Sequence, residues 1–156
     1  EGTADQMSLL ASEKEIDLSM ENGRPVEIEG DRARIKQVVV NLLDNAIKYT
    51  PHGGAVSVSI SPDAAKGLAL LEIADTGNGI PEEDLPYVFD RFFRARKVRR
   101  GDVGGAGLGL SIVRSICAAH GGDISVENRP APAKGAVFRV TFPLAAPSRN
   151  ANETIE

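Results

Sequence analysis

Two asparagines and a lysine share one side of a helical stretch, where their side chains could hold a metal-bound polyanion. Asn41, Asn45 and Lys48 stand in "NLLDNAIKYT", residues 41–50. Asparagine is a poor helix former, and solvated helix faces normally use Glu, Lys and Arg instead. An amide oxygen is a neutral, hard ligand for a divalent cation. The pattern favours a metal-bridged polyanion along the helix, with a plain solvated polar face as the alternative.

A turn that contains two glycines, "DTGNGI" at residues 75–80, directly follows an apolar strand. Gly77 and Gly79 allow positive φ and let a ligand approach the backbone closely. Asp75, at the strand end, can accept a hydrogen bond from an amino group. The turn lacks the further carboxylates that a calcium loop requires. Taken alone, it is explained equally well as a simple turn.

A second glycine cluster, "GGAGLGL" at residues 104–110, leads into a helix. Backbone N–H groups at a helix start, free of side chains, can bind phosphate. Two familiar phosphate loops are excluded. There is no G-x-x-x-x-G-K-[ST], and Leu110 stands where a G-x-G-x-x-G starting at Gly105 needs its last glycine. A flexible hinge is the alternative.

The stretch between the two glycine clusters, "FDRFFRARKVRR" at residues 89–100, is rich in arginine and phenylalanine. A solvated loop or a nucleic-acid patch would explain such a charge run. The net charge of −4 and the clustering of the aromatic residues disfavour nucleic acid. Because glycine-rich turns flank the stretch, we expect a mobile lid over a phosphate ligand.

Hydrophobic periodicity predicts the elements that must position these residues. In chain order they are a helix over 4–14, strands over 15–20 and 26–29, a helix capped by Asp31 and ending near Thr50, strands over 55–60 and 68–75, a short helix from Pro81, a helix over 107–120 and a hairpin of 122–128 and 136–144. The sum is an α/β (α+β) sandwich. About three main helices cover one face of a mixed, mostly antiparallel sheet of about five strands.

Length and composition fit one globular domain. The 156 residues are 42% hydrophobic and 26% charged, and we place the domain at residues 1–146, with a polar, disordered tail at 147–156. The single cysteine, Cys117, excludes a disulfide within the chain. No apolar run approaches the roughly 20 residues of a membrane span.

Taken together and in this order, the four stretches resemble the ATP-binding catalytic domain of sensor histidine kinases, in the GHKL superfamily. "NLLDNAIKYTP" resembles the N box of that family, "DTGNGI" its G1 box, "FDRFFR" its F box and "GGAGLGLSIV" its G2 box. The resemblance covers about residues 5–144. It implies a Bergerat-type fold, binding of ATP with Mg²⁺, and transfer of the γ-phosphoryl group to a histidine.

On the adenine side, the resemblance implies that Asp75 accepts a hydrogen bond from the amino group of the base. Gly77, Gly79 and Ile80 would form the floor of the nucleotide pocket. Thr141 lies where the family often has a threonine near adenine.

On the phosphate side, the resemblance implies that Asn45, with Asn41, holds the Mg²⁺ that bridges the phosphates. Lys48 and Tyr49 would contact phosphate or ribose. The backbone amides of Gly105, Gly107, Leu108 and Gly109 would bind the phosphates. From the lid expected at residues 90–105, we further predict that Lys97 or Arg99 approaches the γ-phosphate when the lid closes over ATP.

Asn41 separates the branches of the superfamily. Gyrase-like and MutL-like ATPases carry a glutamate at this position as general base for water. An amide cannot take a proton near neutral pH, so we expect phosphoryl transfer and no efficient hydrolysis. A GHKL-type ATPase and a non-catalytic nucleotide-binding scaffold remain the alternatives.

The phosphoacceptor histidine of the family lies in a box that typically reads H-E-x-x-T/N-P, which this sequence lacks. Its two histidines, His52 and His120, have structural roles in our interpretation. The implied partners are therefore a dimerisation and histidine phosphotransfer domain of the parent chain and a downstream response regulator. We expect a cytoplasmic domain that contacts neither nucleic acid nor membrane; whether the parent is anchored in the inner membrane is left open.

Overall fold

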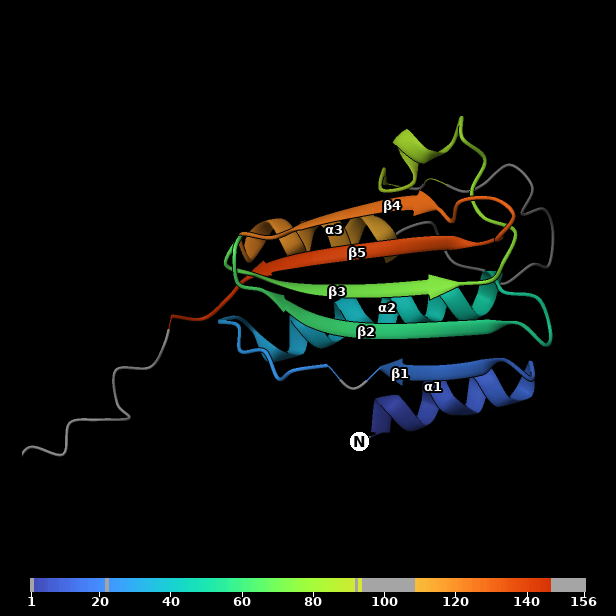
Figure 1. Ribbon diagram of the computed structural model, residues 1–156, viewed down its shortest axis with the longest axis horizontal. Helices are drawn as coiled ribbons and strands as arrows, with labels where there is room; N and C mark the ends of the chain where they lie inside the picture. The colour runs from blue at the N-terminus through green and yellow to red at the C-terminus, as the bar shows by residue number, and fades with distance from the viewer. Residues whose placement is uncertain (1, 22, 92, 94–108, 147–156) are drawn as a thin grey trace, which may run out of the picture.

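The computed structural model describes residues 2–21, 23–91, 93 and 109–146, which form a layer of helices packed on one sheet (Figure 1). The elements are α1 Gly2–Glu13, β1 Asp17–Glu21, α2 Arg32–Tyr49, β2 Ala55–Asp63, β3 Leu68–Asp75, the 3-10 helix η1 Leu85–Tyr87, α3 Gly109–Ala119, β4 Asp123–Asn128 and β5 Ala136–Pro143. No helix within these ranges is long and apolar enough to cross a membrane.

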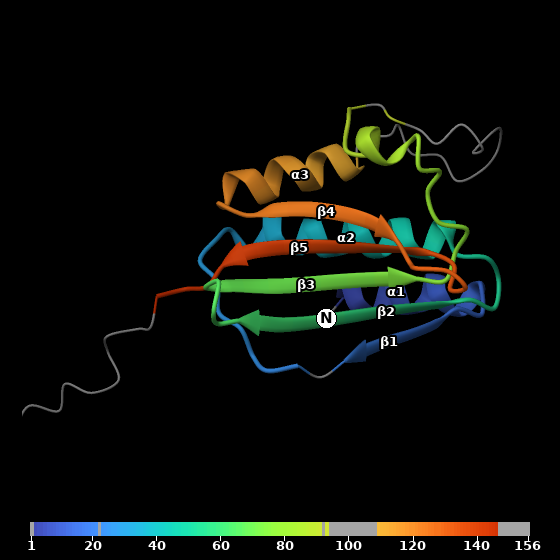
Figure 2. The ribbon, with the colours of Figure 1, turned by 45° about the horizontal axis from the view of Figure 1, so that its top comes forward.

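The sheet has the strand order β1-β2-β3-β5-β4. β1 runs parallel to β2, and the other neighbouring pairs are antiparallel. Figures 1 and 2 show that α1, α2 and α3 all cover the same face. The predicted mixed, mostly antiparallel sheet with helices on one face is confirmed.

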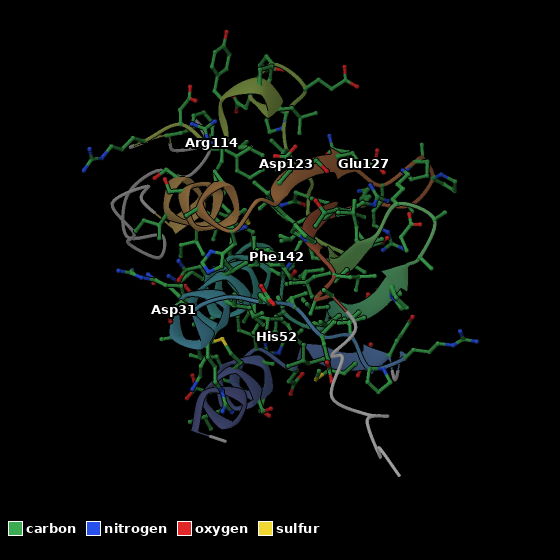
Figure 3. All side chains as sticks on the ribbon, turned by 90° about the vertical axis from the view of Figure 1, so that its left-hand side faces the viewer. Asp31, His52, Arg114, Asp123, Glu127 and Phe142 are labelled. Atoms are coloured by element: carbon green, nitrogen blue, oxygen red, sulfur yellow. The ribbon has the colours of Figure 1, made fainter. Side chains whose placement is uncertain are left out.

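The core lies between the helices and that face of the sheet. Leu42 and Val38 on α2 and Ile73 and Phe138 on the strands are at most 2% exposed. Phe142 points into this interior in the view along the helices (Figure 3). Burying such a side chain contributes about 1.5–3 kcal/mol, so the apolar face of α2 fixes where its polar face lies.

The start of α2 is fixed by its predicted cap. The Asp31 carboxylate accepts hydrogen bonds from the backbone N–H groups of Ala33 at 2.9 Å and Arg34 at 3.3 Å. The two bonds satisfy amides that have no partner within the helix.

Two predicted elements are wrong. Residues 26–29 form no strand. Among the described residues, the backbone of this segment makes one hydrogen bond to a neighbouring segment, from Ala145 N–H, just after β5, to Glu27 O. The helix expected from Pro81 is a turn followed by η1. Pro86 explains this difference, because a proline ring clashes with the carbonyl four residues earlier and stops an α-helix.

One end of the molecule, on the right in Figure 1, gathers two of the segments that the sequence singled out, the end of the helix with the asparagines and the turn after Asp75. The last turn of α2, the end of β3, the end of β4 and the beginning of β5 all lie there. The corner between α1 and β1 lies at the same end. Segments up to about a hundred residues apart in the chain therefore meet at one site.

Candidate active site

Asp75 ends β3 and is only 5% exposed. Its Oδ1 accepts hydrogen bonds from the N–H groups of Gly77 at 2.9 Å and Ala136 at 3.2 Å. Burial raises the pKa of this carboxyl, and the two hydrogen bonds and the charge of Arg129 offset part of that rise. No described residue donates to Oδ2, so the second oxygen can accept from a bound amino group.

The glycines beside Asp75 are required for two different reasons. A Cβ on Gly77 would lie 2.6 Å from Tyr49 O, so the turn packs directly against the end of α2. Gly79 has φ +74, a backbone conformation that residues with a side chain rarely adopt. A Cβ on the buried Gly135 would lie 1.8 Å from Asp75 O. Of the two glycines predicted to allow positive φ, Gly79 uses it and Gly77 provides close approach.

Asn128, the last residue of β4, holds the floor of this turn. Its Oδ1 accepts from Ile80 N–H at 2.8 Å, and its Nδ2 donates to Ile80 O at 2.6 Å. The side-chain amide therefore pairs with both polar backbone groups of Ile80, as a neighbouring strand would. A Cβ on Gly79 would lie 2.8 Å from the same Oδ1. The sequence did not identify Asn128, because its partner is 48 residues away.

The polar side of α2 carries the predicted magnesium and phosphate residues. Asn41 and Asn45 are half-buried, and neither side chain makes a hydrogen bond to any described residue. Lys48 forms an ion pair with Asp44, 2.9 Å from Nζ to Oδ2. Tyr49, the last residue of the helix, is 46% exposed. Two amide oxygens one turn apart therefore remain available as ligands, with a cation beside them.

These residues fit a magnesium ion whose coordination shell is completed by ligands from outside the protein. Mg²⁺ prefers six oxygen ligands and is usually held by one or two protein groups together with phosphates and waters. Across the described part of the chain, no cluster of three His, Cys, Asp or Glu could bind a metal by itself. Asn41 and Asn45 would supply the protein ligands, and the ion would supply charge neutralisation at the phosphates when bound.

Thr141 does not lie at this site, which corrects the prediction made for it. It pairs with Leu70 of β3, whereas the residue of β5 that contacts Asp75 is Ala136. Thr141 also lies on the open face of the sheet, since its neighbours Val140 and Phe142 are buried under the helices. The sequence contained no information on the register of the two strands, so the threonine was placed at the wrong end of β5.

Several predicted phosphate contacts lie outside the described residues: Lys97, Arg99, Gly105, Gly107 and Leu108. Gly109 is the exposed first residue of α3. The start of the basic stretch is anchored, because the ring of Phe89 packs edge-to-face on Phe138 with centroids 6.3 Å apart.

Both histidines have structural partners. His120 uses both ring nitrogens: Nδ1 donates to Ile116 O at 2.8 Å, and Nε2 accepts from Asp31 N–H at 3.1 Å. It thereby ties the end of α3 to the start of α2. His52 is exposed and lies 3.0 Å from Glu15 Oε2.

Comparisons with known proteins agree with this geometry. The family model described as "Histidine kinase-, DNA gyrase B-, and HSP90-like ATPase" matches residues 30–146. Sensor histidine kinase WalK of Bacillus subtilis (strain 168) is 41% identical over 120 residues, which cover 77% of this chain and 19% of WalK. The chain spans between 19% and 33% of the length of the curated relatives WalK, YkoH and SasA.

Solved structures of histidine kinases have the same fold. The catalytic domain of ThkA has a TM-score of 0.75 at 31% identity, covering 91% of this chain and 88% of that one. Full-length ShkA in complex with AMPPNP has a TM-score of 0.78 at 31% identity, covering 93% of this chain and 29% of ShkA. With the family match and these superpositions, the chain belongs to the histidine kinase-, DNA gyrase B- and HSP90-like ATPase family, as the ATP-binding catalytic domain of a sensor histidine kinase.

Proposed function

We propose that this domain binds Mg-ATP between the end of β3 and the polar side of α2, and donates the γ-phosphoryl group to a histidine on a separate dimerisation and phosphoacceptor domain of its parent. A response regulator would then take the phosphoryl group. The observation that carries the proposal is Asp75, a buried carboxylate with one oxygen fixed by the backbone and the other available.

Asp75 would select adenine. Gly77 and Ala136 fix Oδ1, which leaves Oδ2 to accept from the 6-amino group of the base. Guanine presents a carbonyl oxygen at the same place, and two acceptors cannot share a hydrogen bond. A site built to hydrogen-bond one such group rejects a ligand that lacks it, because the buried polar atom is left unpaired.

The phosphates would lie along α2. Asn41 and Asn45 would hold the magnesium ion, and Lys48 would exchange its ion pair with Asp44 for a phosphate oxygen. This pair is half-buried, and i, i+4 pairs on helices contribute only about 0.3–0.5 kcal/mol, so the exchange costs little. The complex of ShkA with AMPPNP, an ATP analogue, supports a nucleotide in this fold.

Transfer of the phosphoryl group to a histidine is favoured over hydrolysis of ATP, because position 41 holds an asparagine and not a carboxylate that could act as general base. An amide cannot remove a proton from water, so the chain can align ATP without activating a water molecule against it. Phosphoryl transfer depends mainly on position and charge neutralisation, which this site supplies.

The acceptor would lie on another domain of the parent. Phosphorylation of His120 would break one of its two ring hydrogen bonds, and with it a link between α2 and α3. ThkA, 30% identical to this chain, was solved in complex with the response regulator protein TrrA, with a TM-score of 0.68 that covers 92% of this chain and 40% of ThkA. That complex supports a response regulator as the downstream partner.

Calorimetric titration with Mg-ATP and Mg-GTP tests the adenine assignment. We expect binding of ATP and a large loss of affinity for GTP. Equal affinities would show that Asp75 does not read the base.

A further inference from the structure

The ammonium group of Lys14 holds the last turn of α2. Its Nζ donates to three backbone carbonyls: Ile47 O at 2.8 Å, Lys48 O at 3.1 Å and Thr50 O at 2.7 Å. A lysine ammonium has three N–H donors, so all of them are used here. A cation at this end of a helix also interacts favourably with the helix dipole.

In the described part of the chain, the only backbone N–H that caps this helix end is that of Thr50. Thr50 leaves the helix in an extended conformation, with φ −91 and ψ 125. The next residue is Pro51, which has no N–H to donate. Both the N–H and the hydroxyl of Thr50 bond to Ala46 O, at 3.1 and 2.6 Å. Among the described residues, Lys14 is therefore the donor to the carbonyls of Ile47, Lys48 and Thr50.

The same turn faces the proposed nucleotide site on two sides. It carries Lys48 and follows directly on Asn45. Tyr49 O lies so close to Gly77 that a Cβ there would come within 2.6 Å. Gly77 N–H in turn fixes Asp75. A displacement of this turn would therefore move Lys48 at the proposed phosphate site and, through Gly77, shift Asp75 at the proposed adenine site.

The backbone of Lys14 is held in place by the turn between α1 and β1. The next residue, Glu15, has φ +52, which is uncommon for a residue other than glycine. Lys14 O accepts from Gly53 N–H at 3.0 Å, and Glu15 pairs with His52 across the same gap. Figure 1 shows this α1–β1 corner beside the loop from α2 to β2. The contacts of this turn therefore fix the backbone from which the Lys14 side chain extends to the end of α2.

We propose that Lys14 is a positioning residue for the nucleotide site, which sets the place of Asn45 and Lys48 without touching the nucleotide. This inference rests on the function proposed above. Partners that hydrogen-bond a metal ligand directly typically change metal affinity by about 10- to 100-fold when removed. Lys14 bonds to the backbone of the turn that follows Asn45, so we expect a loss at the low end of that range. The largest effect should therefore fall on the part of ATP affinity that depends on magnesium, with a smaller loss in excess chelator from the adenine contact.

The test compares ATP affinity in magnesium and in excess chelator for the wild type, Lys14→Met, Lys14→Arg and the control Lys36→Met. Lys36 is an exposed lysine on α2. Lys14→Met should reduce the magnesium-dependent gain in affinity by about tenfold. Lys14→Arg, which keeps the charge and the donors, should restore most of the gain, and Lys36→Met should leave it unchanged.

An unchanged gain in Lys14→Met would overturn the inference, even if the melting temperature fell, because Lys14 would then be a structural cap alone. If that variant does not fold, Lys14→Gln takes its place, since it is neutral and keeps one donor group; an unchanged gain again overturns the inference. A wild-type protein that binds no Mg-ATP would instead refute the proposed function.

Discussion

Replacing Asp75 by asparagine separates two effects of its buried charge: the loss of folding stability that burial of a charge causes, and the hydrogen bond that the carboxylate would accept from adenine. The amide has nearly the shape of the carboxylate, and its oxygen can still accept from Gly77 and Ala136. The loop should therefore keep its conformation. The second oxygen becomes an NH₂ group, which would meet the amino group of adenine as donor against donor.

Binding and stability should change in opposite directions. A hydrogen bond to a charged group contributes about 1.5–3 kcal/mol, so Asp75→Asn should weaken ATP binding by roughly ten- to two-hundred-fold. The free energy of unfolding should rise or stay the same, because the substitution removes a charge from a position that is 5% exposed.

The pH dependence of this stability gain follows from the raised pKa of Asp75. A raised carboxyl pKa means that the folded protein binds the proton more tightly than the unfolded chain does. The contribution of the carboxyl group is present at low pH and is lost as the pH rises through its folded pKa. The advantage of asparagine should therefore be small in acid, grow through that pKa and then stay constant.

Calorimetry with Mg-ATP and urea unfolding, at mildly acidic and at neutral pH, measure these effects. Asp63→Asn, at the far end of β2, is the matched control and should change neither quantity much. Unchanged ATP affinity in Asp75→Asn would refute the adenine contact. A stability gain that shrinks from acidic to neutral pH would refute the reasoning about the buried charge.

Two further substitutions test other parts of the site. Asn45→Ala should weaken ATP binding by roughly tenfold or more in magnesium and much less in excess chelator; equal losses in both would show that Asn45 is not a metal ligand. Asn128→Ala removes both bonds to Ile80, each of which contributes about 0.5–1.5 kcal/mol to stability. It should weaken Mg-ATP binding, because the floor of the pocket is then no longer held in place. Ser125→Ala, on the same strand, is its control, and equal affinities for the two variants would contradict the role of Asn128.

Local patterns predicted the main elements because each pattern reflects burial on one face. The alternation at residues 55–60 of β2 and the apolar sector of α2 both match the side that packs in the core. The cap at Asp31 was equally readable, because a capping bond joins residues only two or three positions apart. The strand expected at 26–29 failed, since a short alternation does not show whether a pairing partner exists.

The site was predictable only where its residues act through local sequence. Asp75 and the glycines beside it form one short motif. Asn128 and Lys14 act on segments 48 and about 35 residues away, and such contacts depend on the completed fold. Thr141 failed for the same reason, because strand register decided which residue of β5 lies beside Asp75.

The proposed function requires that this domain give the γ-phosphoryl group of ATP to a histidine on another domain and not to water. Incubation with γ-labelled ATP, alone and with the phosphoacceptor domain of the parent, distinguishes the two acceptors. We expect acid-labile, base-stable label on the added domain, none on this chain and little free phosphate. Rapid phosphate release by the isolated chain that is abolished in Asn41→Ala would contradict the account and identify an ATPase.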